Sequence, residues 1–518
     1  MLSFAEIVQH PGGSLAMLNQ KLAHTRGLLH ANPANDPQFL SLLFHYEKMR
    51  LDNAMDDNSA FLRERKTPVW FDDAKFGIFI HWSPAAIPAY APLLPPEHVY
   101  AMRGAQNDAD GLSKVWRRLP HAIAYENALR IEHSPTVRYH DEHFAGLTYD
   151  DFVDQFRDQM LPACDPEQWA KLAARAGAKY VVLVTKHQDG FLFWPSDVDN
   201  AYKSDWRSSR DIVGETATAV RARGMRFGTY YCGGADATFG NPPMRDHQTL
   251  IDAPPRTQEY LDYITAQWDE IIERYAPDIA WNDYAFPGPR DHLQRLLRRY
   301  FDRVPDGVVN NRFQEYAGTH LQPCPTYSDF TTPEYTAEGV PDIKWEACRS
   351  VGESFGYNAL ESGETYLSAS DLVHTLADIV ARGGNLLLNI NPTATGTIPF
   401  AEAERLQAIG WWLEDHGEAI FHTRPWDRAV GVTLDGQGVR YTRAPAAVHA
   451  IILGTPPSAE VELDLFLDDG AEVRMPGHNA PLPWTRTPIG TRISLPQAPA
   501  KQPAMTFRLA PAEAVQPA

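Results

Sequence analysis

The feature that most constrains the fold of this chain is a repeated unit in which an amphipathic helix leads directly into a short apolar strand. The clearest copy is CDPEQWAKLAARAGAKYVVLVTKHQDGF, residues 164–191, where Asp165 is suited to cap a helix that Gly177 ends. Comparable helices precede RFGTYY and PDIAW, and the other expected strands are FGIFIHW, GVVNN, IKWEAC and NLLLNIN. Helices that alternate with short apolar strands predict parallel βα units, and this many copies favour an α/β fold of the (β/α)8 (TIM) barrel type over an open sheet.

The stretches on either side of these units lack the alternation. Residues 1–65 are polar with helix-like apolar spacing, which predicts an N-terminal helical extension, and the barrel is expected over residues 66–423. Residues 424–510 carry short strands separated by Pro and Gly turns, which predicts a C-terminal antiparallel β-sandwich. The last residues, 511–518, are expected to form a disordered tail.

The charge balance limits the possible partners. The chain has 47 Lys and Arg against 66 Asp and Glu, a formal net charge of −19, which repels nucleic acid and anionic membranes and favours a neutral partner. No apolar run reaches transmembrane length, and the N-terminus lacks the basic start and apolar core of a secretory signal. We therefore expect a cytoplasmic protein, or a periplasmic or secreted one if a signal has been removed from the chain. The four cysteines lie far apart with no C-x-x-C pair, and we expect them to be buried thiols.

Polar side chains stand at the ends of the expected strands, where a barrel of this type builds its active site. They are His81; His187 with Gln188 and Asp189; Tyr230 with Tyr231; Trp281 with Asp283; Arg312; Glu346; and Asn389 with Asn391. One such residue would mean little, but seven strands in succession predict a polar pocket lined with aromatic rings. Carboxylates among uncharged polar groups suit a neutral polyhydroxylated substrate, and paired carboxylates perform glycoside hydrolysis.

Other interpretations of these residues stay open from the pattern alone. Asp283 could serve as a helix cap or in a structural ion pair, and a histidine such as His81 is more often a satisfied core residue than a ligand. His81, His187 and Asp283 could also hold a metal ion. Because the chain has no H-x-H or H-E-x-x-H motif, we expect no metal at this site.

Five motifs together resemble the α-L-fucosidases of glycoside hydrolase family 29. In order along roughly residues 68–455 they are VWFDDAKFGIFIHWSPAAIPAYAP, DPEQWAKLAARAGAKYVVLVTKHQDGF, PDIAWND, KWEACRSVGESFGYN and ARGGNLLLNINPTATGTIP. The resemblance implies a (β/α)8-like catalytic barrel with a C-terminal β-sandwich, no cofactor, and a retaining double displacement. The implied substrate is a fucosylated oligosaccharide or glycoside, and the oligomeric state, including a homo-oligomer, stays open.

The resemblance also implies roles for individual residues. Asp283, in WND, matches the nucleophile, and Glu334, in TYSDFTTPEY, matches the acid/base, with Glu346 as the second choice for the acid. The residues that match positions binding the sugar or completing the site are His81, His187, Tyr230, Trp281 and Arg312.

Some positions that would contact the sugar depart from the family pattern. Gln188 replaces the second histidine of K-H-H-D-G-F, Ile123 and Ala124 stand where Glu-Trp is usual, and Ala237 stands where close relatives have Trp. We therefore expect weak hydrolysis of a plain aryl α-L-fucoside and better hydrolysis of a fucoside substituted near Ile123, Ala124 and Gln188. A retaining glycosidase for a related sugar such as an α-L-galactoside, or a non-catalytic sugar-binding barrel, is the alternative.

Overall fold

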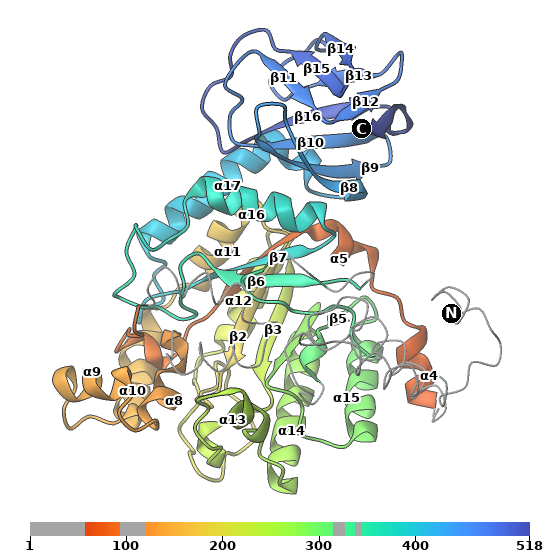
Figure 1. Ribbon diagram of the computed structural model, residues 1–518. Helices are drawn as coiled ribbons and strands as arrows, with labels where there is room; N and C mark the ends of the chain where they lie inside the picture. The colour runs from red at the N-terminus through yellow and green to blue at the C-terminus, as the bar shows by residue number, and fades with distance from the viewer. Residues whose placement is uncertain (1–56, 94–120, 314–326, 337–338, 340–342) are drawn as a thin grey trace, which may run out of the picture.

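The computed structural model describes residues 57–93, 121–313, 327–336, 339 and 343–518, which form a larger part of strands and helices and a smaller all-β part (Figure 1). Within the described residues, the larger part holds a sheet of seven parallel strands in the order β5-β4-β3-β2-β1-β7-β6. The strands are β1 Phe76–Ile80, β2 Tyr180–Lys186, β3 Arg226–Cys232, β4 Ile279–Asp283, β5 Val308–Val309, β6 Glu346–Ser350 and β7 Asn385–Ile390.

A two-residue segment links the two edge strands of this sheet. Phe330 forms a parallel bridge with Asn310 beside β5, and Thr331 forms one with Trp345 beside β6. The backbone N–H of Glu346 donates to the carbonyl oxygen of Thr331 at 2.8 Å. Residues 330–331 thus occupy an eighth position between β5 and β6, and the predicted (β/α)8-like barrel is confirmed.

Helices cover the outside of the barrel (Figure 1). The N-cap predicted at Asp165 is confirmed, since its carboxylate accepts from the backbone N–H of Glu167 at 3.1 Å. The helices are α4 Asp57–Glu64, α5 Val69–Ala74, α8 Tyr125–Leu129, α9 Pro135–His143, α10 Tyr149–Gln155, α11 Pro166–Arg175, α12 Ile212–Arg221, α13 His247–Asp252, α14 Gln258–Tyr275, α15 Arg290–Arg303, α16 Ala369–Ala381 and α17 Phe400–His416.

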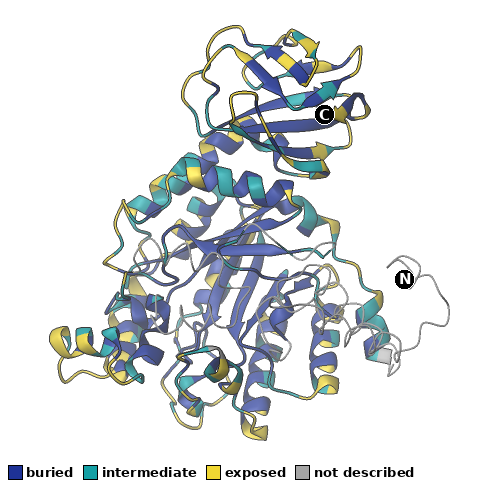
Figure 2. Cartoon of the chain, in the orientation of Figure 1, coloured by how far each residue is buried: buried dark blue, intermediate teal, exposed yellow. Residues whose placement is uncertain are grey.

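The barrel strands are buried on both faces, which explains why they read as continuous apolar runs (Figure 2). In β2, Val182 and Val184 pack inside the barrel with Trp281, whereas Val181 and Leu183 pack against the helices. Side chains at the strand ends therefore converge on one mouth of the barrel.

The C-terminal part is antiparallel, as predicted for the β-sandwich. A sheet in the order β13-β16-β10-β9-β8 accompanies a three-stranded sheet β11-β15-β14 and a pair β12-β17. The strands are β8 Arg424–Val432, β9 Gly438–Ala444, β10 Ala447–Leu453, β11 Glu460–Leu463, β12 Leu465–Leu467, β13 Glu472–Arg474, β14 Trp484–Thr487, β15 Gly490–Ser494, β16 Ala504–Ala510 and β17 Val515–Pro517.

The disordered tail expected at residues 511–518 is wrong. These residues include β17, which pairs with β12 in the register Leu467 with Val515 and Leu465 with Pro517. Ala512, Ala514 and Val515 are buried in the apolar core of the sandwich, so these three side chains and the backbone pairing order a segment whose Ala- and Pro-rich composition gave no strand signal.

The predicted N-terminal extension lies mostly outside the described residues. Its described end is α4, which packs on α15, where the guanidinium of Arg298 lies 4.1 Å from the ring centroid of Phe61. None of the helices in the described ranges combines the length and the apolar character that crossing a membrane requires.

Candidate active site

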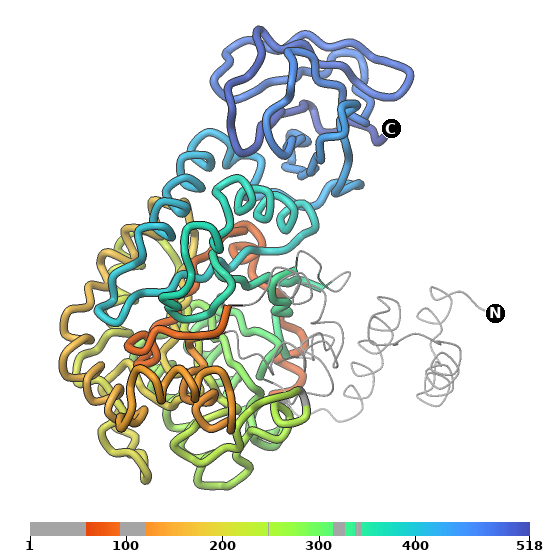
Figure 3. Tube along the Cα trace, turned by 60° about the vertical axis from the view of Figure 1, so that its left-hand side comes forward, coloured from red at the N-terminus to blue at the C-terminus, as the bar shows by residue number. Residues whose placement is uncertain are grey.

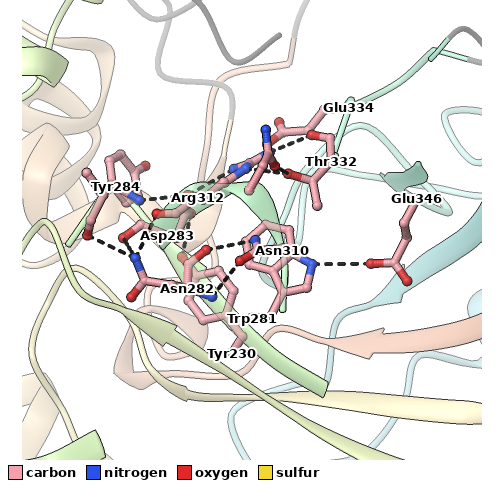
Figure 4. Close-up of polar contacts among 12 residues, drawn as sticks. Tyr230, Trp281, Asn282, Asp283, Tyr284, Asn310, Arg312, Thr332, Glu334 and Glu346 are labelled. Carbon is pink, nitrogen blue, oxygen red and sulfur yellow. Dashed lines mark hydrogen bonds and ion pairs between the residues drawn. The ribbon is translucent and has the colours of Figure 1, made fainter. Parts of the chain in front are cut away.

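Asp283 ends β4 at the mouth of the barrel, where three donors meet its carboxylate (Figure 4). Its Oδ1 accepts from the backbone N–H of Tyr284 and from Nη1 of Arg312, both at 2.9 Å, and its Oδ2 accepts from the hydroxyl of Tyr230 at 2.7 Å. The residue is only 7% exposed. These donors compensate the cost of burying a charged group at the end of an apolar strand.

Arg312 connects Asp283 with Glu334. Its Nη2 lies 2.5 Å from Oε1 of Glu334, while its Nε donates to the hydroxyl of Thr332 at 2.8 Å. The guanidinium carbon also lies 4.7 Å from the ring centroid of Trp281. The two carboxylates that the sequence singled out as a catalytic pair are thus brought to one buried cation (Figure 4).

The two candidates for the acid differ in exposure. The side chain of Glu334 is 22% exposed, whereas Glu346 is fully buried. Both carboxylate oxygens of Glu346 accept hydrogen bonds, one from the hydroxyl of Tyr180 at 2.5 Å and one from the indole N–H of Trp281 at 3.2 Å. Burial raises the pKa of Glu346 to about 7. Glu346 is the first residue of β6 and pairs with the first residue of β7, so it lies at the end of the barrel opposite the mouth, and its expected place at a strand's carboxyl end is wrong. There it supports Trp281, and Glu334 is the more exposed of the two carboxylates.

His81 has a defined tautomer. Its Nδ1 lies 2.7 Å from Oδ1 of Asn389, and Nδ2 of Asn389 donates to Oδ1 of Asn391 at 2.7 Å. Because the amide oxygen of Asn389 therefore faces the imidazole, His81 carries its proton on Nδ1 and its Nε2 is an acceptor. Burial, reinforced by the neighbouring His187, holds the pKa of His81 well below its ordinary value, which keeps the ring neutral.

His187 and Gln188 hold buried polar atoms that are unpaired within the described part of the chain. The ring of His187 stacks on Tyr230 at 5.6 Å between centroids, and its Nδ1 has no partner there. Burial lowers the pKa of His187 to about 4. Gln188 is 1% exposed, and neither its Nε2 nor its Oε1 has a partner. Unpaired buried groups cost free energy, so these atoms are suited to hydrogen bonds with a bound ligand.

Aromatic rings complete the wall. Tyr230 stacks on Trp281 at 5.2 Å, and Phe355 lies 5.0 Å from His81. Ile123 packs in the same interior cluster as Tyr230 and Trp281, and the next residue, Ala124, is also buried. Of the apolar replacements noted in the sequence, Ile123 therefore lies beside the site, where its backbone N–H donates to the carbonyl of Phe355 at 2.9 Å.

Several residues at the mouth escaped the sequence analysis as site residues. Thr332 holds Arg312, and Phe355 and His121 contact each other at 5.1 Å between centroids. Their signal was weak, because Phe355 stood inside a quoted motif without a distinct chemical role, and His121 preceded the two unusual positions, Ile123 and Ala124.

Metal ligation finds no support in the geometry of the described residues, where no three His, Cys, Asp or Glu side chains are grouped to hold an ion. Of the cysteines, Cys164, Cys232 and Cys348 are free and buried, and Cys324 lies outside the described ranges.

Comparison with known proteins gives consistent matches over most of the chain. The family model described as "Alpha-L-fucosidase" matches residues 43–418. Tissue alpha-L-fucosidase of Mus musculus is 32% identical over 452 residues, covering 85% of this chain and 90% of that protein, and the Homo sapiens protein of the same name is 32% identical over 450 residues, covering 85% and 87%. The crystal structure of Thermotoga maritima alpha-fucosidase in complex with fucose is 36% identical, with a TM-score of 0.75, and covers 87% of this chain and 98% of that one.

Proposed function

This chain belongs to the alpha-L-fucosidase family, and from that premise we propose that it is an exo-acting glycoside hydrolase that releases α-linked L-fucose with retention of configuration. The observation that carries the proposal is the single guanidinium of Arg312 in contact with both Asp283 and Glu334. In retaining glycosidases the two carboxyl groups are only roughly 5–5.5 Å apart, and contact with one shared cation supports such proximity.

In the first step, a carboxylate oxygen of Asp283 attacks the anomeric carbon, while the carboxyl group of Glu334 gives its proton to the departing glycosidic oxygen. In the second step, Glu334 takes a proton from water, and the resulting oxygen attacks the same carbon and displaces Asp283. The hydroxyl of Tyr230 and the N–H of Tyr284 hold the Asp283 carboxylate in place for attack. Two inversions leave the released sugar in the α configuration.

The sugar-binding residues support a finer proposal about the substrate. Gln188 offers a donor and an acceptor that are unpaired in the described chain, and Ile123 presents an apolar side chain where a charged partner is usual. The ring hydroxyl of plain fucose meets no charged partner near these residues, so it gains little binding free energy there. A fucoside that carries a substituent on this hydroxyl therefore loses less binding free energy than plain fucose does.

The proposal is tested by the Asp283→Ala variant, assayed on a panel of plain and ring-substituted α-L-fucosides. We expect hydrolysis of the best substrate to fall by about 10⁴-fold or more, and added azide to restore turnover as a β-fucosyl azide product. Asp278→Asn, at the other end of the same β4 segment, is the matched control that should retain activity.

Undiminished hydrolysis by Asp283→Ala, or a β-configured first product from the native enzyme by NMR, would overturn the proposed mechanism. On the same panel, the native enzyme should prefer a substituted fucoside. A preference for the plain fucoside would contradict the finer proposal. If an α-L-galactoside, assayed beside the panel, is hydrolysed while no fucoside is, the sugar would be reassigned.

A further inference from the structure

His121 lies at the mouth of the barrel beside Glu334, and the proposed reaction gives it no role. Its ring is nearly parallel to that of Tyr335, at 15° with 6.4 Å between centroids, and it contacts Phe355 at 5.1 Å. Tyr335 follows Glu334 directly in the chain, and the Glu334 carboxylate acts electrostatically on His121. His121 therefore belongs to the side of the site where the proposed acid stands.

The hydrogen bond of His121 fixes which nitrogen carries the proton. The backbone N–H of Phe355 donates to its Nδ1 at 3.2 Å, so Nδ1 must be an acceptor and the proton of the neutral ring sits on Nε2. Burial lowers the pKa of His121 to about 4, against the opposing effect of Glu334, which agrees with a neutral ring. Within the described chain no residue accepts a hydrogen bond from Nε2.

The two imidazoles beside Phe355 have opposite polarity. His81, 5.0 Å from Phe355, presents an acceptor at Nε2, whereas His121, 5.1 Å from the same ring, presents a donor. They also differ in exposure, since His81 is 4% exposed and His121 is half-buried. The leaving group of an exo-acting hydrolase extends from the buried sugar toward solvent, so His121, the more exposed residue of the two, is the better placed to meet it.

We infer that His121 forms a subsite for the leaving group, in which its Nε2–H donates to an oxygen of a sugar and Tyr335 positions the ring of His121. Tyr335 is 7% exposed, its hydroxyl donates to the carbonyl of Glu353 at 2.7 Å, and the guanidinium carbon of Arg349 lies 5.5 Å from its ring centroid, so its own ring is not a surface for the sugar. A single neutral donor suits a hydroxyl of a saccharide better than a charged leaving group. The inference rests on the proposed function, because Glu334 as the acid defines the leaving-group side.

The test compares His121→Phe with His121→Gln. Phe keeps a ring that can pack on Tyr335 and Phe355 but removes the donor, whereas Gln places an amide donor near the position of Nε2. Both are assayed on a fucosyl disaccharide and on an aryl α-L-fucoside, whose leaving group lacks sugar hydroxyls, and inhibition by free L-fucose is measured in parallel. Melting temperatures of both variants establish that they are folded.

We expect His121→Phe to lower kcat/KM for the disaccharide about tenfold more than for the aryl fucoside, the effect of about one hydrogen bond, and His121→Gln to recover much of that difference. Inhibition by L-fucose, which lacks a leaving group, should change less than twofold. An equal loss on both substrates, no recovery with Gln, or a tenfold weaker inhibition by L-fucose would overturn the subsite. If the native enzyme cleaves no α-L-fucoside, the proposed function fails as well; selective failure of the His121 prediction in an active enzyme rejects the subsite alone.

Discussion

At the scale of single residues, three carboxylates of the barrel differ in where they lie and in what surrounds them: Asp283 ends its strand at the mouth, whereas Glu346 begins its strand at the opposite end. Asp283 receives hydrogen bonds on both oxygens, Glu334 contacts Arg312 and remains partly exposed, and Glu346 is enclosed by Tyr180 and Trp281. The environment thus gives one kind of functional group three proposed roles: nucleophile, acid, and support for an aromatic ring.

The buried state of Glu346 has a consequence for stability. Burial raises its pKa in the folded protein from 4.5 to about 7, so the folded state holds this proton more tightly than the unfolded chain does. Glu346 therefore reduces the free energy of unfolding progressively as pH rises from about 4.5 to about 7. Since Gln cannot ionise, we expect the melting temperature of Glu346→Gln, measured relative to the native protein, to rise across that window.

Thermal melts between pH 4.5 and 7.5 measure this difference. Glu167→Gln is the control, because the hydrogen bonds from Arg223 lower the pKa of Glu167 from 4.5, and its stabilising effect is lost only as pH falls below about 4.5. Between pH 4.5 and 7.5 the difference in melting temperature between this variant and the native protein should therefore stay nearly constant. A difference for Glu346→Gln that stays constant over the window contradicts the assignment of its buried, protonated state.

The sequence predicted the positions that meet at the mouth of the barrel for a physical reason. Asp283 and His81 each follow an apolar strand, and parallel strands bring their ends to one rim. Which of Glu334 and Glu346 is the better candidate for the acid was harder to predict, because the answer depends on whether another side chain covers each carboxylate. His121 could not be predicted at all, since its tautomer is set by Phe355, 234 residues further along the chain.

At the scale of elements, an irregularity at the end of β2 decides which side chains face the mouth. The pairing register with β3 shifts between Val184 and Lys186. Lys186 then lies on the outer side, in a fully buried ion pair with Asp236 at 2.7 Å, and His187 turns inward to stack on Tyr230. If side chains had alternated strictly between the two faces of β2, Lys186 would point inside the barrel and His187 outside. The irregularity at this strand end therefore places His187 in the site.

We expect Lys186→Met to lower the free energy of unfolding by about 3–5 kcal/mol, because it leaves the buried Asp236 carboxylate without its cation. The double variant Lys186→Met/Asp236→Asn should lose less than the two single variants together. Chemical denaturation measures both. Arg295→Met, which breaks an exposed pair with Asp291 on α15, is the matched control and should cost under about 1 kcal/mol. If Lys186→Met also lowers the free energy of unfolding by less than about 1 kcal/mol, the ion pair of Lys186 with Asp236 does not stabilise this junction.

The elements themselves were predictable where periodicity was strong. FGIFIHW and NLLLNIN correspond to β1 and β7, whose burial on both faces leaves an unbroken apolar run. The link at residues 330–331 escaped prediction, because two residues are too few to show a repeating apolar pattern. Their pairing depends on β5 and β6. The same holds for β17, whose strand is created by pairing with β12.

At the scale of the whole molecule, α16 and α17 lie between the barrel and the β-sandwich, and Figure 3 shows this arrangement from a second direction. The indole N–H of Trp412 on α17 donates to the carbonyl of Ala504 in β16 at 2.8 Å, and His416 contacts the hydroxyl of Thr506 at 2.8 Å. His374 on α16 contacts the carbonyl of Pro503 at 2.7 Å. Buried polar contacts of this kind make the sandwich part of the support for the helices that cover the barrel.

We expect the contact between α17 and the sandwich to depend most on Trp412. It is 4% exposed and stacks on His416 at 5.1 Å, whereas its neighbour Trp411 is 63% exposed. We expect Trp412→Ala to lower the free energy of unfolding by about 3–5 kcal/mol, since it leaves a cavity and an unpaired carbonyl at Ala504. Because this contact couples the barrel to the β-sandwich, its loss should also divide a single calorimetric transition into two, one for the barrel and one for the sandwich.

Trp411→Ala provides the control within the same helix turn. It removes an equal side-chain volume from the exposed face, so its effect on the free energy of unfolding should stay within about 0.5 kcal/mol and the transition should remain single. Differential scanning calorimetry of both variants, with the ratio of calorimetric to van't Hoff enthalpy, distinguishes the cases. If Trp412→Ala melts at a lower temperature but still in one transition, the contacts of His416 and His374 suffice to couple the sandwich to the barrel, and the central place given to Trp412 is wrong.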